Sequence, residues 1–394
     1  MEINFYDTAI AFKGKTNKEL KSAYYLFKIM KNRGLVKTSE RMLLLAMRLK
    51  IPYSWVIEST IYKQFVGGKS IEESTSVVEK LSKYNVHSIL DYSVEGNTSP
   101  DGMDRTMEET LRTIENASNN KYIPFAVFKP SAFASPHLLE NAIQGKPLDN
   151  VMFSLLGDFK NRVDILCNRA FQLGVPIMID AEESWYQHLV DETIEEMMLK
   201  YNKQKAIVFN TLQMYRHDRL KFLRESLVKA REKGYFIGIK FVRGAYMERE
   251  RARAIDKGYP SPICGTKEET DKLYNEALIL TLENLDIAAL FSGSHNEESN
   301  MLLAKEMVKR NINPGDKRIW ISQLYGMSDH ISFNLAHHGF NVAKYVPYGP
   351  VKSVMPYLLR RAEENTAISG QTTRELRLLQ LEKIRRAKNN ATKN

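Results

Sequence analysis

The sequence is poor in cysteine, since its 394 residues contain only Cys167 and Cys264. Two cysteines supply neither a disulfide framework nor the ligand spacing of a structural zinc site, so we expect no metal centre and a reducing compartment. No apolar run approaches the ~20 residues of a membrane-spanning helix. The N-terminus resembles neither a secretory signal nor a transit peptide. We therefore expect a globular, cytoplasmic protein that is not an integral membrane protein.

The net charge of +10 is not accompanied by any nucleic-acid motif. The sequence lacks zinc-finger spacing, an aromatic ribonucleoprotein motif and a helix-turn-helix signal, so we expect no nucleic-acid partner. About half of the positive excess lies in residues 374–394. We interpret this tail as a solvated basic helix, because its leucines form no clean stripe. The alternative is peripheral contact with an anionic membrane, such as the inner membrane of a cell, at ~1 kcal/mol per basic residue near the surface.

Phosphate-binding glycine motifs are absent as well. No G-x-G-x-x-G follows any β-rich run, which counts against a dinucleotide-binding sheet. Gly68-Lys69-Ser70 superficially resembles a phosphate-binding loop, but Lys63 occupies the position of its first glycine and no strand precedes it. We interpret this segment as the end of one helix followed by the start of another.

Eight short β-rich runs alternate with longer amphipathic segments from about residue 86 onward. Such crossover segments are what parallel strands require. The pattern predicts an α/β fold, a (β/α)8 TIM-like barrel over residues 85–370, with an open doubly wound sheet as the competing architecture. Residues 1–84 are predicted to form an α-helical arm, and residues 371–394 the basic tail. The eight runs are 86–92, 122–129, 175–181, 206–213, 235–242, 287–293, 319–324 and 342–347.

Polar residues stand at the ends of most of these runs. In a barrel the chemistry gathers at the carboxyl ends of the strands, so we expect these side chains to line one pocket. Several cations with one or two carboxylates suit an anionic ligand. The strand-end residues are Lys129, Asp180, Gln213, Lys240 with Arg243, Ser294 with His295, Gln323 and Tyr345.

A helix predicted after the last run carries two adjacent arginines, Arg360 and Arg361. Tyr357, Arg361 and Glu364 share a face at i, i+4 and i+7. Paired guanidinium groups match planar oxyanions two bonds at a time, which indicates a carboxylate or phosphate ligand. The alternative is a solvated face of Arg–Glu pairs.

Several of these segments together resemble the signature segments of the proline dehydrogenase family, in the family's order and over roughly residues 85–370. The resemblance implies a distorted barrel that binds FAD and oxidises L-proline to Δ1-pyrroline-5-carboxylate. The stand-alone, monofunctional type is implied, since neither end resembles the further modules of bifunctional relatives. The segments are K-F-V-R-G-A-Y-M-E-R-E-R (240–251), V-F-N-T-L-Q-M-Y (208–215), I-D-A-E-E (179–183), Q-L-Y-G-M (323–327) and Y-V-P-Y-G-P…Y-L-L-R-R-A-E-E-N (345–365).

The resemblance also implies roles for individual residues. Arg360 and Arg361, with Lys129, are expected to hold the substrate carboxylate, and Glu364 to hold the arginine pair. Asp180 is expected to orient the cations and the ring. The expected walls of the proline ring are Tyr345, Tyr357, Leu324 and Tyr246. The expected flavin contacts are Gln213, Lys240, Val242, Arg243, Gly244, Ala245, Ser294, His295, Asn296, Gln323 and Leu324.

Tyr345 also bears on specificity, because the related hydroxyproline oxidase lacks a tyrosine at this position, so proline is favoured over 4-hydroxyproline. The sequence departs from many relatives at Phe241, where they carry Leu, and from longer relatives at Met247, where they carry Trp. Both are apolar exchanges that bear on flavin packing. The resemblance further implies that a membrane quinone reoxidises the flavin.

Three alternatives stay open from the sequence. The first is a flavin dehydrogenase acting on hydroxyproline or another cyclic amino acid. The second is a flavin-free barrel aldolase that uses a strand-end lysine as a Schiff base, with the arginines holding a phosphate. The third is a non-catalytic basic binding protein, whose nucleic-acid binding would depend steeply on salt.

Overall fold

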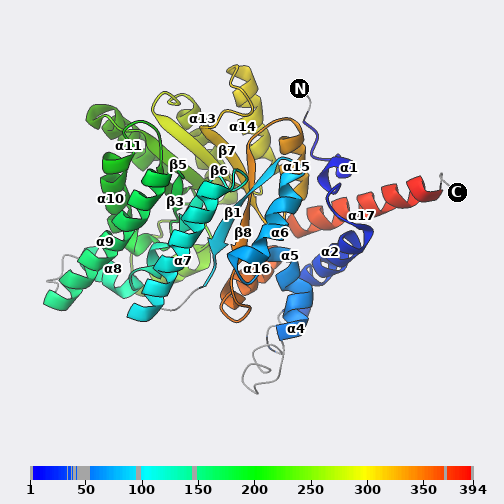
Figure 1. Cartoon of the computed structure of the whole chain (residues 1–394), viewed down its shortest axis with the longest axis horizontal. Helices are drawn as coiled ribbons and strands as arrows, with labels where there is room; N and C mark the ends of the chain where they lie inside the picture. The colour runs from blue at the N-terminus through cyan, green and yellow to red at the C-terminus, as the bar shows by residue number, and fades with distance from the viewer. Residues whose placement is uncertain are drawn as a thin grey trace. The chain divides into compact units, whose positions relative to one another are not determined.

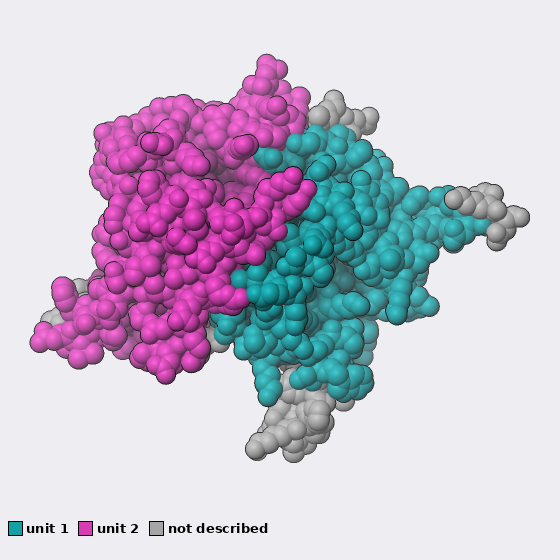
Figure 2. Space-filling view, viewed as in Figure 1, with its two compact units in different colours: residues 1–95, 323–394 teal, residues 96–322 magenta. Residues whose placement is uncertain are grey.

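The computed structural model describes residues 3–32, 34–36, 38, 41, 54–94, 99–143, 149–367 and 371–391, without the side chains of 362–367 and 371. The chain divides into two compact units, one of residues 1–95 with 323–394 and one of residues 96–322 (Figure 2). Our sequence-based boundaries after residues 84 and 370 stay a prediction.

Eight parallel strands form the sheet in the order β1-β8-β7-β6-β5-β4-β3-β2. Their side chains are almost all buried, as expected where helices cover a parallel sheet. The strands alternate with helices, so the predicted (β/α)8 barrel is confirmed. They are β1 (Val86–Tyr92), β2 (Ala126–Phe128), β3 (Ile177–Ile179), β4 (Val208–Gln213), β5 (Ile237–Val242), β6 (Ala288–Gly293), β7 (Ile319–Leu324) and β8 (Val342–Tyr348).

β2 and β3 are shorter than the runs 122–129 and 175–181 predicted for them. Pro124 and Pro176 lie just before these strands, and proline has no N–H to donate to a ladder. The short strands remain in register, with Phe128 opposite Ile179. Their carboxyl ends therefore meet at the same edge of the sheet.

Several helices of the unit 96–322 begin or end at capping signals that the sequence carries. Thr266 and Glu269 form a capping box at the start of α13, and Gly174 and Gly234 end α9 and α11 in the left-handed conformation. The helices are α7 (Pro100–Asn119), η2 (Pro130–Ala132), α8 (Pro136–Ile143), α9 (Asn150–Leu173), α10 (Ser184–Tyr201), α11 (Arg219–Lys233), α12 (Met247–Lys257), α13 (Lys267–Leu282) and α14 (Glu297–Lys309).

The other unit combines β1 and β8 with helices from both ends of the chain. The capping box predicted at Thr16 and Glu19 is confirmed at the start of α2. α5 ends at Phe65 and α6 begins at Ile71, as interpreted from the glycines between them. The helices are α1 (Thr8–Ala11), α2 (Asn17–Met30), α4 (Ser54–Ile57), the π-helical turn η1 (Glu58–Tyr62), α5 (Lys63–Phe65), α6 (Ile71–Ser82), α15 (Asp329–His337), α16 (Met355–Ala367) and α17 (Gln371–Ala391).

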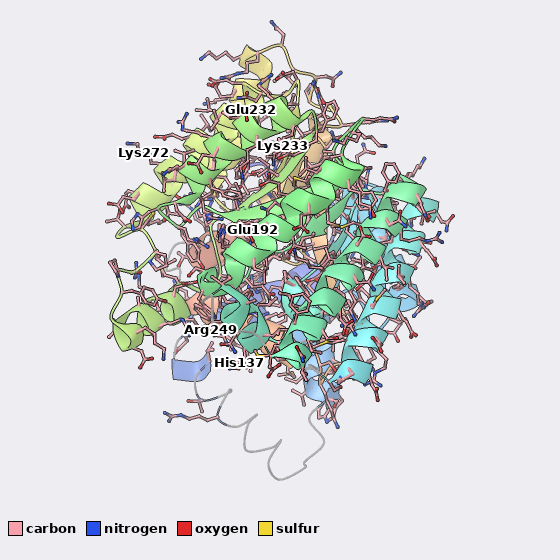
Figure 3. The ribbon with its side chains drawn as sticks, turned by 90° about the vertical axis from the view of Figure 1, so that its left-hand side faces the viewer. His137, Glu192, Glu232, Lys233, Arg249 and Lys272 are labelled. Atoms are coloured by element: carbon pink, nitrogen blue, oxygen red, sulfur yellow. The ribbon has the colours of Figure 1, made fainter. Side chains whose placement is uncertain are left out.

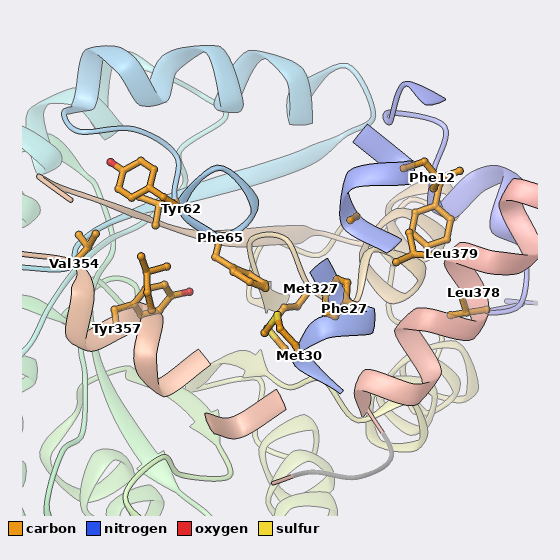
Figure 4. Close-up of a cluster of buried hydrophobic side chains, with 14 of the residues drawn as sticks. Phe12, Phe27, Met30, Tyr62, Phe65, Met327, Val354, Tyr357, Leu378 and Leu379 are labelled. Atoms are coloured by element: carbon orange, nitrogen blue, oxygen red, sulfur yellow. The ribbon is translucent and has the colours of Figure 1, made fainter. Parts of the chain in front are cut away.

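The basic tail is a docked helix, so our interpretation of it as solvated is wrong for residues 371–391. α17 lies against α2 (red against blue in Figure 1). Leu378 and Leu379 are buried in a cluster that also contains Phe27 (Figure 4). Glu382, fully buried, accepts hydrogen bonds from Arg385 and Arg386. The buried residues of α17 recur at helical spacing and form one face, which is polar at several positions: they are Thr372, Glu375, Leu378, Leu379 and Glu382.

Replacing Leu379 by alanine is expected to lower the free energy of unfolding by about 3 kcal/mol, because it leaves a cavity in this cluster. Urea unfolding of the full chain measures the effect. Leu381 lies on the same helix with 41% of its surface exposed, so Leu381→Ala is the matched control and is expected to change stability by less than ~0.5 kcal/mol. Equal effects at both positions would contradict the docking of α17.

Candidate functional site

Asp180, directly after β3, and Lys240, near the end of β5, form an ion pair across the intervening strand β4 in the unit 96–322. The ammonium Nζ of Lys240 donates to Asp180 Oδ1 at 2.6 Å. Lys240 is almost fully buried in β5, and the backbone N–H of Asp180 donates to the carbonyl of Phe128 at 2.9 Å. The pair therefore places one fixed cation and one carboxylate on the inner side of these strand ends.

Arg243 follows β5 and is held at every nitrogen of its guanidinium. Nε donates to Asp271, Nη1 to Ser294 at 2.6 Å, and Nη2 to Ser299 at 2.9 Å. Its guanidinium also lies 4.4 Å from the centre of the Tyr274 ring. Burial raises the pKa of the Asp271 carboxyl, but hydrogen bonds and charges from Lys267 and Arg243 outweigh that effect and hold the pKa below its usual value.

The loop after β6 is built onto the same cluster. Asn296 caps α14 by accepting a hydrogen bond from the N–H of Ser299, and its own N–H donates to Ser294 Oγ. The structure thus brings together three of the predicted flavin contacts: Arg243, Ser294 and Asn296. His295 lies between them in the chain and is half-buried.

Three buried side-chain atoms on β4 have no hydrogen-bond partner among the described residues: Oδ1 of Asn210, Oγ1 of Thr211 and Oε1 of Gln213. Thr211 and Gln213, which are 3% and 2% exposed, lie two residues apart and so share one face of the strand. An unpaired buried polar atom costs roughly 1–3 kcal/mol. Both side chains could therefore form hydrogen bonds with a bound group that carries donors, which agrees with the flavin contact expected of Gln213.

The segment after β5 approaches β4 closely. Val242 accepts a hydrogen bond from the N–H of Met214 at 2.8 Å. Gly244 has φ +127°, and a Cβ there would lie 2.5 Å from the Tyr215 ring. Only glycine meets both conditions. Ala245 is exposed, and Tyr246 is half-buried directly before α12.

Three of the four residues predicted to surround the proline ring, Tyr345, Tyr357 and Leu324, lie in the other unit, whereas Tyr246 lies in the unit 96–322. Tyr345 and Tyr357 are 7% and 5% exposed, and the Arg361 guanidinium lies 5.2 Å from the centre of the Tyr357 ring. The N–H of Tyr325 donates to the carbonyl of Tyr345 at 2.7 Å, which fixes the segment after β7 beside β8. Arg361 is 8% exposed, which removes the solvated-face alternative for this arginine.

Four further predicted residues are placed with less detail. Gln323 is buried and its Oε1 accepts a hydrogen bond from Ser332 at 2.6 Å. Leu324 packs against the cluster of Figure 4, and Arg360 is half-buried. Glu364 lies outside the residues whose side chains the structure describes. The predicted site residues thus form two groups, each assembled within its own unit, and their common pocket stays a prediction.

Sequence reasoning missed the residues that hold the predicted ones in place. Asp271 and Ser299, which hold Arg243, lie within helices, Asp271 in α13 and Ser299 in the first turn of α14. Glu182 lies in the segment I-D-A-E-E (179–183), and its buried carboxylate accepts a hydrogen bond from Ser131. Two adjacent acidic residues shortly after a strand could have indicated this role from the sequence.

Among the described residues, no helix is long and apolar enough to span a membrane, and no group of three or more His, Cys, Asp or Glu side chains is arranged to hold a metal ion.

Comparison with known proteins agrees with this geometry. The family model described as "Proline dehydrogenase" matches residues 74–374. The carbapenem antibiotics biosynthesis protein CarD of Pectobacterium carotovorum subsp. carotovorum is 38% identical over 328 residues, which cover 83% of this chain and 85% of that protein. Proline dehydrogenase 1, mitochondrial, of Dictyostelium discoideum is 32% identical, over 96% of this chain and 74% of that protein.

Among solved structures, proline utilization A (PutA) from Bdellovibrio bacteriovorus matches with a TM-score of 0.71 at 20% identity. The match covers 91% of this chain but only 38% of that one, so this chain spans well under half of the PutA chain. At this identity the likeness concerns the fold. Since the family model extends over most of the chain, and the relatives above extend over most of it too, the chain belongs to the proline dehydrogenase family.

Proposed function

We propose that this chain oxidises L-proline to Δ1-pyrroline-5-carboxylate with FAD as the cofactor and a quinone as the final electron acceptor. The observation that carries the proposal is the buried Arg361 stacked on Tyr357, with Tyr345 buried in the same unit. A buried guanidinium beside aromatic rings suits a ligand with a carboxylate on an apolar ring. Membership of the proline dehydrogenase family supports proline as that ligand.

In this proposal the chain's own residues bind and orient the substrate. Arg360, Arg361 and Lys129 hold the carboxylate, while Tyr345 and Tyr357 flank the ring. Fixed cations lower the pKa of the substrate ammonium by like-charge repulsion, which favours the free amine that loses a hydride from the neighbouring carbon. Holding that carbon in one position is the main contribution of a protein to such a reaction.

The bound flavin would supply the hydride acceptor, and the unit 96–322 offers residues that fit it. Arg243, Ser294 and Asn296 form a preassembled polar cluster. Gln213 Oε1 and Thr211 Oγ1 are buried acceptors without a partner among the described residues. Lys240, held by Asp180, is the cation that we place near the flavin ring.

The Schiff-base alternative finds less support in this geometry. A Schiff-base lysine needs a neutral amine. Lys240, the buried lysine of β5, donates a hydrogen bond to Asp180 at 2.6 Å. The Asp180 carboxylate thus engages the nitrogen of Lys240, so this lysine is not positioned to attack a carbonyl.

A quinone acceptor would bring the protein to a membrane surface, so we propose a cytoplasmic protein with peripheral membrane contact. Leu378 and Leu379 are buried against α2 and are not available for this contact. Leu381 and Ile384 are the exposed apolar residues of α17.

An anaerobic visible spectrum, recorded before and after addition of L-proline, tests the cofactor and the substrate together. We expect flavin absorbance that bleaches with proline but not with pyrrolidine, which lacks the carboxylate. If the flavin stays oxidised with proline but bleaches with 4-hydroxyproline, the substrate is 4-hydroxyproline and not proline. A colourless chain that FAD does not reconstitute would overturn the flavin proposal.

A further inference from the structure

The carboxylate of Glu182 joins the segment after β3 to the segment after β2. Ser131 donates to it twice, through its backbone N–H at 2.8 Å and through its hydroxyl at 2.6 Å. Glu182 is 6% exposed, and its own N–H donates to Gln187 of α10. Both carboxylate oxygens are therefore engaged by a single residue of the neighbouring loop.

Ser131 lies two positions after Lys129, which is the residue that the proposed function places on the substrate carboxylate. On the other side of Lys129, the carbonyl of Phe128 accepts the N–H of Asp180 at 2.9 Å. Only Lys129 and Pro130 lie between these two anchors. The ring of Pro130 fixes its φ, and the Lys129 carbonyl accepts the N–H of Ala132 at 3.1 Å.

The position of the Lys129 backbone is thus set from the β3 side, by the N–H of Asp180 and by the carboxylate of Glu182. A buried carboxylate is costly unless hydrogen bonds replace the lost hydration, and here both oxygens accept hydrogen bonds from Ser131, one from its backbone N–H and one from its hydroxyl. A residue that only filled the core would not need a charged group. The carboxylate of Glu182 is therefore explained by its hydrogen bonds to Ser131.

We propose that Glu182 is a positioning residue, which holds Lys129 in place for the substrate carboxylate by binding the Ser131 N–H and hydroxyl. The inference rests on the proposed function, because it takes Lys129 to contact the substrate. It adds that the affinity for the carboxylate depends on the charge state of Glu182, since a protonated carboxyl group cannot accept both hydrogen bonds in this geometry.

The groups around Glu182 make this charge state responsive near neutral pH. Burial raises the pKa of Glu182 to about 7, and the adjacent Glu183 acts in the same direction, while the hydrogen bonds from Ser131 and the charge of Lys129 lower it. Tyr186 of α10 also faces this carboxylate, and Arg249 of α12 pairs with Glu183. Below pH ~7 the carboxyl group gains a proton, and its bond to Ser131 weakens.

The test measures the binding of cyclopentanecarboxylate, a ring carboxylate without the amine, to the flavin-loaded chain by perturbation of its visible spectrum between pH 6 and 8. For the unmodified chain, Kd is expected to rise roughly tenfold as the pH falls from 8 to 6. For Glu182→Gln, Kd is expected to be roughly tenfold raised at pH 8 and to change little with pH. Flavin content is expected to stay unchanged.

Two further variants keep the test decisive. Ser131→Ala removes one of the two bonds without altering charge, and is expected to raise Kd by a few-fold; it also replaces Glu182→Gln if that variant does not fold. Glu232→Gln changes an exposed carboxylate on α11 (Figure 3) and is expected to behave as the unmodified chain.

A Glu182→Gln variant that binds cyclopentanecarboxylate as the unmodified chain does, with the same pH dependence, would overturn the inference. So would Ser131→Ala without any effect. Bleaching of the unmodified chain by proline is recorded separately, so that a failure of the proposed substrate is distinguished from a failure of the role of Glu182.

Discussion

Replacement of Asp329 by asparagine is expected to lower the free energy of unfolding by about 3–5 kcal/mol. Asp329 is 7% exposed and bonds to two lysines that are distant in the sequence. Lys15 lies 3.1 Å from its Oδ2, and Lys344, fully buried, lies 3.0 Å from its Oδ1. Asparagine keeps the shape but removes the carboxylate that both ammonium groups bond to. Urea unfolding measures the difference.

The matched control is a carboxylate that pairs at the surface. Asp286 binds Arg231 at 2.6 Å, with the two side chains about half exposed. Because solvent screens such a pair, Asp286→Asn is expected to cost less than ~1 kcal/mol. Equal destabilisation by the two variants would show that the buried pair contributes no more than the exposed one.

The pH dependence of stability supplies an independent check of the Asp329 prediction. Burial alone would raise the pKa of Asp329, but the charges of Lys15 and Lys344 outweigh it and hold the pKa well below the ordinary value of 3.8. A carboxylate with a lowered folded-state pKa contributes its full stability above the unfolded-state value and loses it as the pH falls below that value. The difference between the unmodified chain and Asp329→Asn is therefore expected to shrink below about pH 4.

The Asp329 cluster also shows which features lay beyond sequence reasoning. Strands were found because β-branched and aromatic runs are local signals, and caps were found because Thr16 and Glu19 are three residues apart. Lys15, Asp329 and Lys344 have no such local relation. Their pairing depends on the tertiary packing of an N-terminal segment against β8 and the start of α15.

The same physical limit explains the partial success at the candidate site. Arg243, Ser294 and Asn296 were found because strand ends of a barrel converge, whereas Asp271 and Ser299, which hold Arg243, lie within helices. The docking of α17 was missed because its buried face contains polar residues, Glu375 and Glu382 among them, and so shows no apolar stripe. Sequence patterns therefore identify the residues that strands present, but not the side chains that support them.

Replacement of Arg361 by methionine is expected to raise KM for proline by roughly 30- to 1000-fold, equivalent to about 2–4 kcal/mol of lost substrate binding. Arg361 is 8% exposed and lies 5.2 Å from the centre of the Tyr357 ring. Methionine has a similar length and an apolar surface, so it fills the space beside the ring but offers no donor to a carboxylate. Steady-state kinetics with proline measures the change, and flavin absorbance per chain is expected to stay the same.

Two other substitutions separate the contribution of charge from that of geometry. Arg361→Lys keeps the positive charge but loses the planar fork of donors, so an intermediate rise in KM is expected. Arg231→Met removes an exposed guanidinium paired with Asp286 and is expected to leave KM unchanged. An unchanged KM for proline in Arg361→Met would refute the contact between Arg361 and the substrate carboxylate.

If Arg361→Met lost flavin in step with the rise in KM, Arg361 would be assigned to the cofactor and not to the substrate. The structure gives a reason to expect a raised KM with unchanged flavin content. The preassembled polar cluster of Arg243, Ser294 and Asn296 belongs to the unit 96–322, whereas Arg361 belongs to the other unit, together with Tyr345 and Tyr357. A guanidinium stacked on an aromatic ring is held in one orientation at little cost in entropy. Removing it should therefore weaken the binding of a ring carboxylate and leave the residues that fit the flavin intact.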